Sequence, residues 1–127
     1  MEELEPATVL QREDCLDRLS AAPLARILVS VKCLPTALPA RIQVLNREKI
    51  LISSSDPSIL LAAQRHDVLT VQVDGVDDSN HTWSVVASGI AQVDAGVGPM
   101  DDVLGDALSH GGQLVSFPVS VVVGQRH

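Results

Sequence analysis

Side chains that could carry out chemistry are few and scattered in this chain. Its histidines are His66, His81, His110 and His127. No two of them have the HxH or HxxxH spacing of a metal site, so we expect no bound metal. Cys15 and Cys33 form no CxxC pair, and we expect both to be small buried hydrophobic residues in a reducing compartment. The chain also lacks the GxSxG, GxGxxG and Walker A patterns.

Two helices are predicted to help position these side chains. Thr8, with Gln11 three residues later, has the pattern of a capping box and predicts a helix that Pro23 ends. The acidic residues 1–7 are expected to form a loose arm. Asp56 is a good N-cap before Pro57 and predicts a second helix, which closes at 66–67.

Strands are predicted from alternating apolar residues in six segments. These segments are 27–31, 38–44, 49–53, 69–74, 82–93 and 115–123. Residues 46–48 fit a tight connection, and Gly89 predicts a bulge or bend. Residues 75–81 are predicted to form a loop, and 100–108 a short helix. The whole chain, 1–127, therefore predicts one mainly β domain, a six-stranded Greek-key barrel with two or three short helices.

Composition excludes several classes of partner. The net charge is −7, from 16 acidic and 9 basic residues, so we expect neither nucleic acid nor a membrane surface to bind. Trp83 and Phe117 are the only aromatic residues, which leaves two rings for stacking on a ligand. The acidic N-terminus lacks the basic region of a secretory signal, and no apolar run is long enough to span a bilayer. We therefore expect a cytoplasmic protein.

Six segments match, in order, the motifs of one known family. They are 13–19, 25–29, 38–42, 49–54, 83–89 and 124–126. Among them, Trp-Ser-Val-Val-Ala-Ser-Gly at 83–89 is similar to a Trp-Ser-Val-x-x-x-Gly strand. From residue 12 onward the chain thus resembles the pyridoxamine 5'-phosphate oxidase-like proteins of actinobacteria. The resemblance implies an FMN-binding split barrel, usually a homodimer, with a flavin or deazaflavin at the subunit interface.

The resemblance also implies a set of cofactor-binding residues. They are Pro39, Arg41, Ser53, Ser54, Ser55 and Trp83. The phosphate of FMN needs cations or N–H donors around it. Arg41 is the best candidate cation, while the three serines and the following helix N-terminus could supply hydroxyl and N–H donors.

Each of these residues also has a purely structural interpretation. Arg41 could pair with an acid on the surface, and the serines could simply cap the helix. Trp83 could belong to the core or to a dimer interface. Relatives carry a Lys or Arg in the helix after the third strand, where our alignment places Ile59, and the Asp56 carboxylate would repel a phosphate.

Two functions remain open from the sequence. The first is a flavin- or deazaflavin-dependent oxidoreductase that transfers hydride to a small molecule, which the sequence does not identify. The second is a cofactor-free split-barrel dimer that acts as a binding or structural protein. Either would be a homodimer, because residues 115–123 are expected to present a row of apolar side chains on one face, with Pro118 at an edge.

Overall fold

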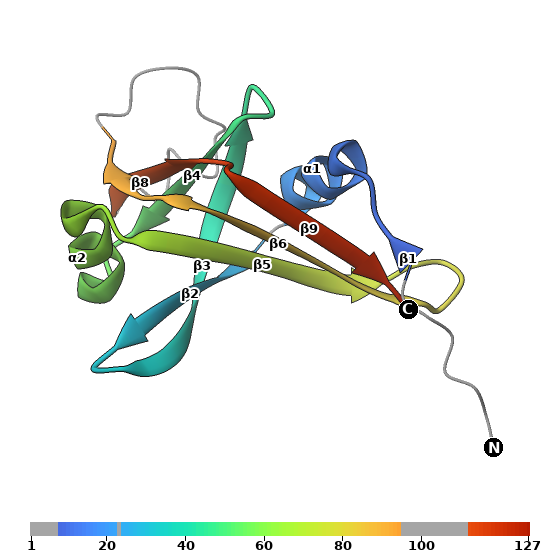
Figure 1. Cartoon of the computed structure of the whole chain (residues 1–127), viewed down its shortest axis with the longest axis horizontal. Coiled ribbons are helices and arrows are strands. Elements are labelled where there is room, and N and C mark those ends of the chain that lie inside the picture. The colour runs from blue at the N-terminus through green and yellow to red at the C-terminus, as the bar shows by residue number, and fades with distance from the viewer. Residues whose placement is uncertain (1–7, 23, 95–111) are drawn as a thin grey trace.

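The computed structural model describes residues 8–22, 24–94 and 112–127. Nine antiparallel strands form one open sheet in the order β1-β9-β6-β5-β2-β3-β4-β8-β7, the arrangement of a split barrel. Figure 1 shows β5, β6 and β9 running side by side across the molecule, with α1 and α2 toward its opposite ends. Among the described residues, no helix is long and apolar enough to cross a membrane.

Two helices accompany the strands, α1 at Arg12–Ala21 and α2 at Pro57–Arg65. The strands are β1 at Thr8–Val9, β2 at Ala25–Val31, β3 at Leu34–Leu45, β4 at Lys49–Ser54, β5 at Val68–Val76, β6 at Thr82–Ile90, β7 at Gln92–Val93, β8 at Gln113–Pro118 and β9 at Val121–Arg126. The predicted N-terminal arm and the short helix at 100–108 lie outside the described residues.

The core is aliphatic, as the scarcity of aromatic residues requires. Strands β2, β5 and β6 have side chains that alternate between the interior and the outer face, whereas the central residues of β4 and β8 are buried on both faces. Phe117 is fully buried among Ile27, Ile52, Val71 and Val85. Both helices pack against this core, α1 through the face that carries Leu16 and α2 through the face that carries Ile59.

Helix α2 begins and ends as predicted, but α1 does not. Asp56 is the N-cap of α2, with its carboxylate accepting from the Ser58 N–H at 2.8 Å, and His66 ends the helix in a left-handed conformation. Helix α1, in contrast, begins at Arg12 without a side-chain cap, and Thr8 belongs to β1. The capping-box prediction was wrong because Thr8 and Val9 pair with the last strand instead.

Turn geometry at 46–47 confirms the predicted tight connection. Asn46 and Arg47 both have positive φ, and the Glu48 N–H donates to the Leu45 carbonyl at 3.1 Å. This pair of left-handed residues is typical of a type I′ hairpin turn. Lys32 and Cys33 have the same conformation between β2 and β3. Without Gly or Asn there, the sequence carried no signal for that second turn.

Two predicted strands are divided in the structure. The segment 82–93 separates into β6 and β7 at Ala91, whose N–H donates to the Asp67 carbonyl at 2.9 Å. Gly89 is not a bulge in β6. It is required because a Cβ there would overlap the carbonyl oxygen of Pro118. The close approach of two backbones explains this glycine.

The last predicted strand is likewise two strands, β8 and β9. The break at Val119–Ser120 changes which side chains face outward. Phe117 is fully buried, whereas Val121 and Val123 are 56% and 49% exposed. The predicted single apolar row on one face is therefore wrong.

The two thiols differ in environment. Cys15 is buried beneath Gly124, and burial raises the pKa of its thiol, an effect strengthened by the charge of Asp14. Cys33 lies exposed at the β2–β3 turn, contrary to the expectation that it is buried.

Candidate functional site

Arg41 and Ser53 lie side by side on neighbouring strands. The register of β3 and β4 places their Cα atoms directly opposite each other, so their side chains share one face of the sheet. Arg41 is exposed, whereas Ser53 is 8% exposed. Pro39 lies two residues from Arg41 on the same face and is also exposed. The structure thus brings three of the predicted site residues together.

Ser54 and Ser55 lead from this face into α2. The Ser54 hydroxyl accepts a hydrogen bond from the Asp56 N–H at 3.0 Å, and the Asp56 carboxylate holds the Ser58 N–H. Asp56 is therefore the residue that caps α2, and Ser54 holds the backbone of Asp56 just before the helix. Ser55 is exposed. An anion at this helix end would meet the Asp56 carboxylate, so the helix end itself is poorly suited to a phosphate.

Ile59 does not occupy a ligand-facing position. It is fully buried in the core with Ala62 and Ala63, on the inner side of α2. A basic residue at this position would face the barrel interior. Our alignment of the relatives' cation with Ile59 stays a prediction, but helical spacing puts the side chain at residue 59 against the core.

Trp83 is remote from the serines. In the sheet order, three strands separate its strand β6 from β4. The ring is half-buried against the core, and the Arg18 guanidinium lies 4.6 Å from its centroid. A methyl group at Gly75 would come within 2.8 Å of Trp83 Cζ2, so the glycine makes room for this ring. Within one chain, Trp83 does not join the predicted site.

All nine basic residues of the chain are described, and only some have acidic partners. Four are in ion pairs: Arg26 with Asp74, Arg47 with Glu13 and Asp17, Lys49 with Asp94, and Arg126 with Asp77. Arg12, Arg18, Lys32, Arg41 and Arg65 form no ion pair with the described acids. Arg41 is thus not neutralised by any acid in residues 8–22, 24–94 and 112–127.

A cavity of about 710 Å³ lies between α2 and the ends of β2 and β5. We call it the α2 cavity. Two of the unpaired bases, Lys32 and Arg65, line it together with Ser58 and Thr70, and Leu28 and Leu61 are among its apolar wall residues. Its volume is in the range of small-molecule and cofactor sites. Sequence reasoning missed Lys32 because its turn was not recognised.

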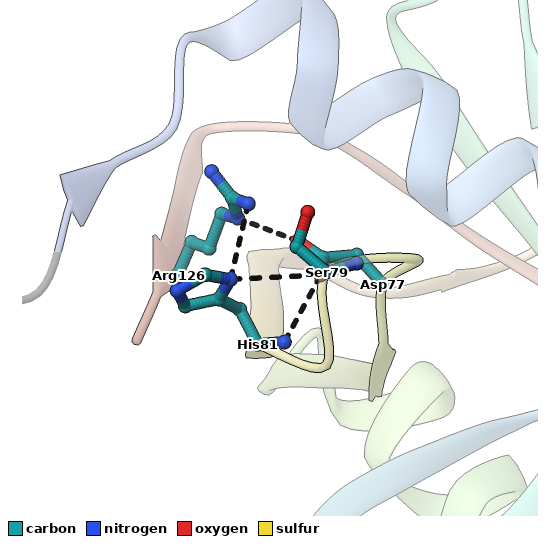
Figure 2. Close-up of polar contacts among 4 residues, drawn as sticks. All are labelled: Asp77, Ser79, His81 and Arg126. Atoms are coloured by element: carbon teal, nitrogen blue, oxygen red, sulfur yellow. Dashed lines mark hydrogen bonds and ion pairs between the residues drawn. The ribbon is translucent and has the colours of Figure 1, made fainter.

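A polar network at the opposite end of the sheet holds the β5–β6 loop to β9. Figure 2 shows the Asp77 carboxylate accepting from the Ser79 and His81 N–H groups and from Arg126 Nε. Partial burial alone would raise the pKa of Asp77, but the His81 N–H and the Arg126 guanidinium together lower that pKa below its ordinary value. Arg126 and Asp77 are too far apart in sequence for spacing to have indicated this pair.

Metal ligands are not gathered anywhere in the described part of the chain. No group of three or more His, Cys, Asp or Glu side chains there could hold a metal ion. The unpaired guanidinium and ammonium groups, which lie beside a cavity with an apolar wall, could bind an anion.

This open antiparallel sheet and its two capping helices define a split-barrel protein. Residues 11–95 match the family model described as pyridoxamine 5'-phosphate oxidase. Since the match covers more than half of the chain, the protein belongs to the pyridoxamine 5'-phosphate oxidase family. No curated protein sequence matches the chain significantly.

Solved structures share the fold over nearly the whole chain. An FAD-binding protein from Mycobacterium smegmatis has a TM-score of 0.69 at 22% identity, covering 96% of this chain and 99% of that one. An FAD-binding protein from Mesorhizobium loti has a TM-score of 0.72 at 15% identity, covering 95% and 96%. A protein from Corynebacterium glutamicum, described as a pyridoxamine 5'-phosphate oxidase, has a TM-score of 0.68 at 20% identity, covering 96% and 98%. These likenesses establish the fold.

Proposed function

We propose that this protein binds a flavin-type cofactor, FMN or a deazaflavin, and uses it to transfer hydride to a small molecule. Family membership supports the proposal, and two structures with the same fold are of FAD-binding proteins. When bound, the ring of such a cofactor supplies the redox chemistry itself. The chain then needs to bind, orient and shield the cofactor, and it does not need a catalytic acid or base of its own.

The observation that carries the proposal is the unpaired Arg41 beside Ser53. A phosphate has nearly two negative charges and is bound best by a guanidinium with neighbouring O–H or N–H donors. Arg41 provides the guanidinium and Ser53 provides an O–H donor, both on the same face of the sheet. In this proposal Ser54, Ser55 and Pro39 shape the surroundings of the phosphate, and Trp83 contributes only if a second subunit brings it near.

The α2 cavity offers a second place for the phosphate in the same proposal. Lys32 and Arg65 are two unpaired cations within one lining, and the apolar wall suits a ring. Ser58, at the start of α2, connects this cavity in sequence to the serines at 53–55. Substitutions distinguish the two positions.

Calorimetric titration with FMN, FAD and a deazaflavin tests the proposal, with riboflavin as the ligand that lacks phosphate. We expect Arg41→Gln to weaken FMN binding by about 10- to 150-fold, the value of one charge-assisted hydrogen bond, and to leave riboflavin binding unchanged. Arg12→Gln removes another unpaired arginine, on α1, and is the matched control. If Lys32→Gln with Arg65→Gln gives that loss and Arg41→Gln does not, the phosphate lies in the α2 cavity.

Failure of every flavin to bind at millimolar concentration would reject the proposal. The protein would then be a cofactor-free split barrel acting as a binding or structural protein. The capping of α2 by Asp56 and the buried Ile59 favour this alternative, because they leave no cation in the first turn of that helix.

A further inference from the structure

A second pocket lies at the end of the sheet far from Ser53. Its volume is about 550 Å³, and its lining includes Gln11, Asp14 and Arg18 near or on α1, Asp77 and Asp78 on the β5–β6 loop, and Arg126 on β9. We call it the Arg18 pocket. Three segments that are distant in sequence form its walls, so the folded sheet is required to assemble it.

The polar groups on one wall of the Arg18 pocket already have hydrogen-bond partners within the chain. Asp77 accepts three hydrogen bonds, from Arg126 and from the N–H groups of Ser79 and His81 (Figure 2). Arg126 also lies 3.3 Å from His81 Nδ1 through a terminal nitrogen. These groups have their partners within the chain, and their role is to hold the wall in place.

Arg18 has no such partners. Its guanidinium lies on the Trp83 ring, and its Nε is buried without a hydrogen-bond acceptor. Asp14 is one helical turn earlier, at a spacing that allows an ion pair, yet no ion pair joins Arg18 to any described acid. A guanidinium that lies over an aromatic ring, with no acid paired to it, is available to bind an oxyanion through its other N–H donors.

The acids of the pocket limit which oxyanion can bind. Asp14 and Asp78 line the same space and form no ion pair with the described bases. With Asp77, three carboxylates face two guanidinium groups, so a dianion such as phosphate would be repelled. A ligand that carries an ammonium group as well as a carboxylate would satisfy both sets of charges.

We propose that the Arg18 pocket binds a small zwitterion of the amino-acid class. The ligand's carboxylate lies against Arg18, and its ammonium group lies toward Asp14 and Asp78. Within one chain this site is separate from the proposed flavin site, because three strands lie between the strand of Trp83 and the strand that carries Ser53. Binding here is expected with or without a flavin.

Trp83 provides the measurement, since it is the only tryptophan and the chain has no tyrosine. Fluorescence of the full chain without flavin is followed as L-alanine is added at constant ionic strength. Acetate, methylammonium and inorganic phosphate are the comparison probes. We expect a saturable change with alanine and at least about 10-fold weaker binding of each singly charged probe, since each satisfies one side of the pocket only.

Two variants test the assignment of the residues. Arg18→Gln is expected to weaken alanine binding by at least about 10-fold. Asp14→Asn is expected to weaken alanine binding but not acetate binding, because it removes a carboxylate that repels acetate. Arg12→Gln, on the same helix and outside the pocket, should bind as the wild type does. Because Arg18→Gln itself alters the surroundings of Trp83, its affinity is measured by calorimetry, and its thermal unfolding is compared with that of the wild type.

Several results would overturn the proposal. No saturable signal at ~50 mM alanine would exclude even a Kd near 1 mM. Acetate binding as tightly as alanine would show a simple carboxylate site, and tight phosphate binding would show that the three carboxylates do not govern selectivity. Unchanged alanine affinity in a folded Arg18→Gln protein would show that this guanidinium is not the anchor.

Discussion

Individual arginines in this chain have distinct roles that their partners define. Arg47 ties the β3–β4 turn to α1 through Glu13 and Asp17, and Arg126 ties β9 to Asp77. Arg18 and Arg41 have no acidic partner among the described residues. An exposed ion pair contributes little net free energy to folding, so the paired arginines add little to stability. The unpaired guanidinium groups are the ones available to bind a ligand.

At the residue scale, we predict that Asp77 makes stability depend on acid pH. The pKa of Asp77 is lowered in the folded protein, so its stabilising effect is complete above its unfolded pKa and is lost as the pH falls through the lower folded pKa. Asp77→Asn should therefore reduce Tm at pH 7, and the difference from the wild type should shrink below ~pH 4. Thermal unfolding between pH 7 and pH 2 measures both effects.

The neighbouring Asp78 supplies the control for this prediction. Asp78→Asn removes the same charge one residue away and leaves the three hydrogen bonds of Asp77 in place. Its Tm should follow the wild type throughout. A Tm difference for Asp77→Asn that stays constant down to pH 2 would show that the carboxylate charge is not what stabilises the loop.

Elements differ in how well the sequence predicts them. Helix α2 was predicted at both ends because Asp56, Pro57 and His66 act locally, through their own backbone and capping preferences. Strand β1 was missed because its pairing with β9 is decided by residues more than a hundred positions away. The division of 82–93 also depends on a distant contact, the hydrogen bond from the Ala91 N–H to the Asp67 carbonyl.

For the candidate site too, local contacts could be predicted from the sequence and distant ones could not. Arg41 and Ser53 could be predicted because a short hairpin fixes their register. The α2 cavity and the Arg18 pocket could not, because each gathers side chains from three or more segments. The sequence alone could not fix which way the side chain of Ile59 points, since a shift of one position on a helix turns a side chain by about 100°.

At the element scale, we predict that the two sides of α2 differ sharply in their contribution to stability. Ile59→Ala should lower the free energy of unfolding by about 2–5 kcal/mol, because it removes a fully buried side chain. Leu61→Ala, on the same helix but 44% exposed, should change it by less than ~1 kcal/mol. Urea titration of both variants measures the difference. Equal losses would mean that α2 packs by another face.

The molecule as a whole presents an apolar patch on its outer sheet surface. Val121 and Val123 project from β9, Val86 lies opposite Val123 on β6, and Val9 is 72% exposed on β1. Cross-strand partners share a face, so these valines form one outward surface. Apolar patches of this kind often mark interfaces between proteins.

At the scale of the whole molecule, we predict a homodimer through this valine patch. Light scattering should give twice the chain mass of 13.5 kDa, and Val123→Asp should shift the protein toward the monomer. Each chain carries a net charge of −7, so dimers should be favoured by added salt, which screens the repulsion. Leu34→Asp, at an exposed apolar site on the β2–β3 hairpin, is the control. A monomer at micromolar concentration in high salt would contradict the prediction.

The pairing of β1 with β9 has a consequence for how the chain is made. Thr8 lies opposite Arg126, so Thr8 leaves the ribosome long before its partner does. At ~5–20 residues per second, the stretch from Thr8 to Val121 takes roughly 6 to 23 s to synthesise. Once β6 has been synthesised it lacks β9 for the rest of that interval, and its unpaired edge is open to other nascent chains. The nascent protein is therefore most vulnerable to aggregation just before translation of β9 is completed.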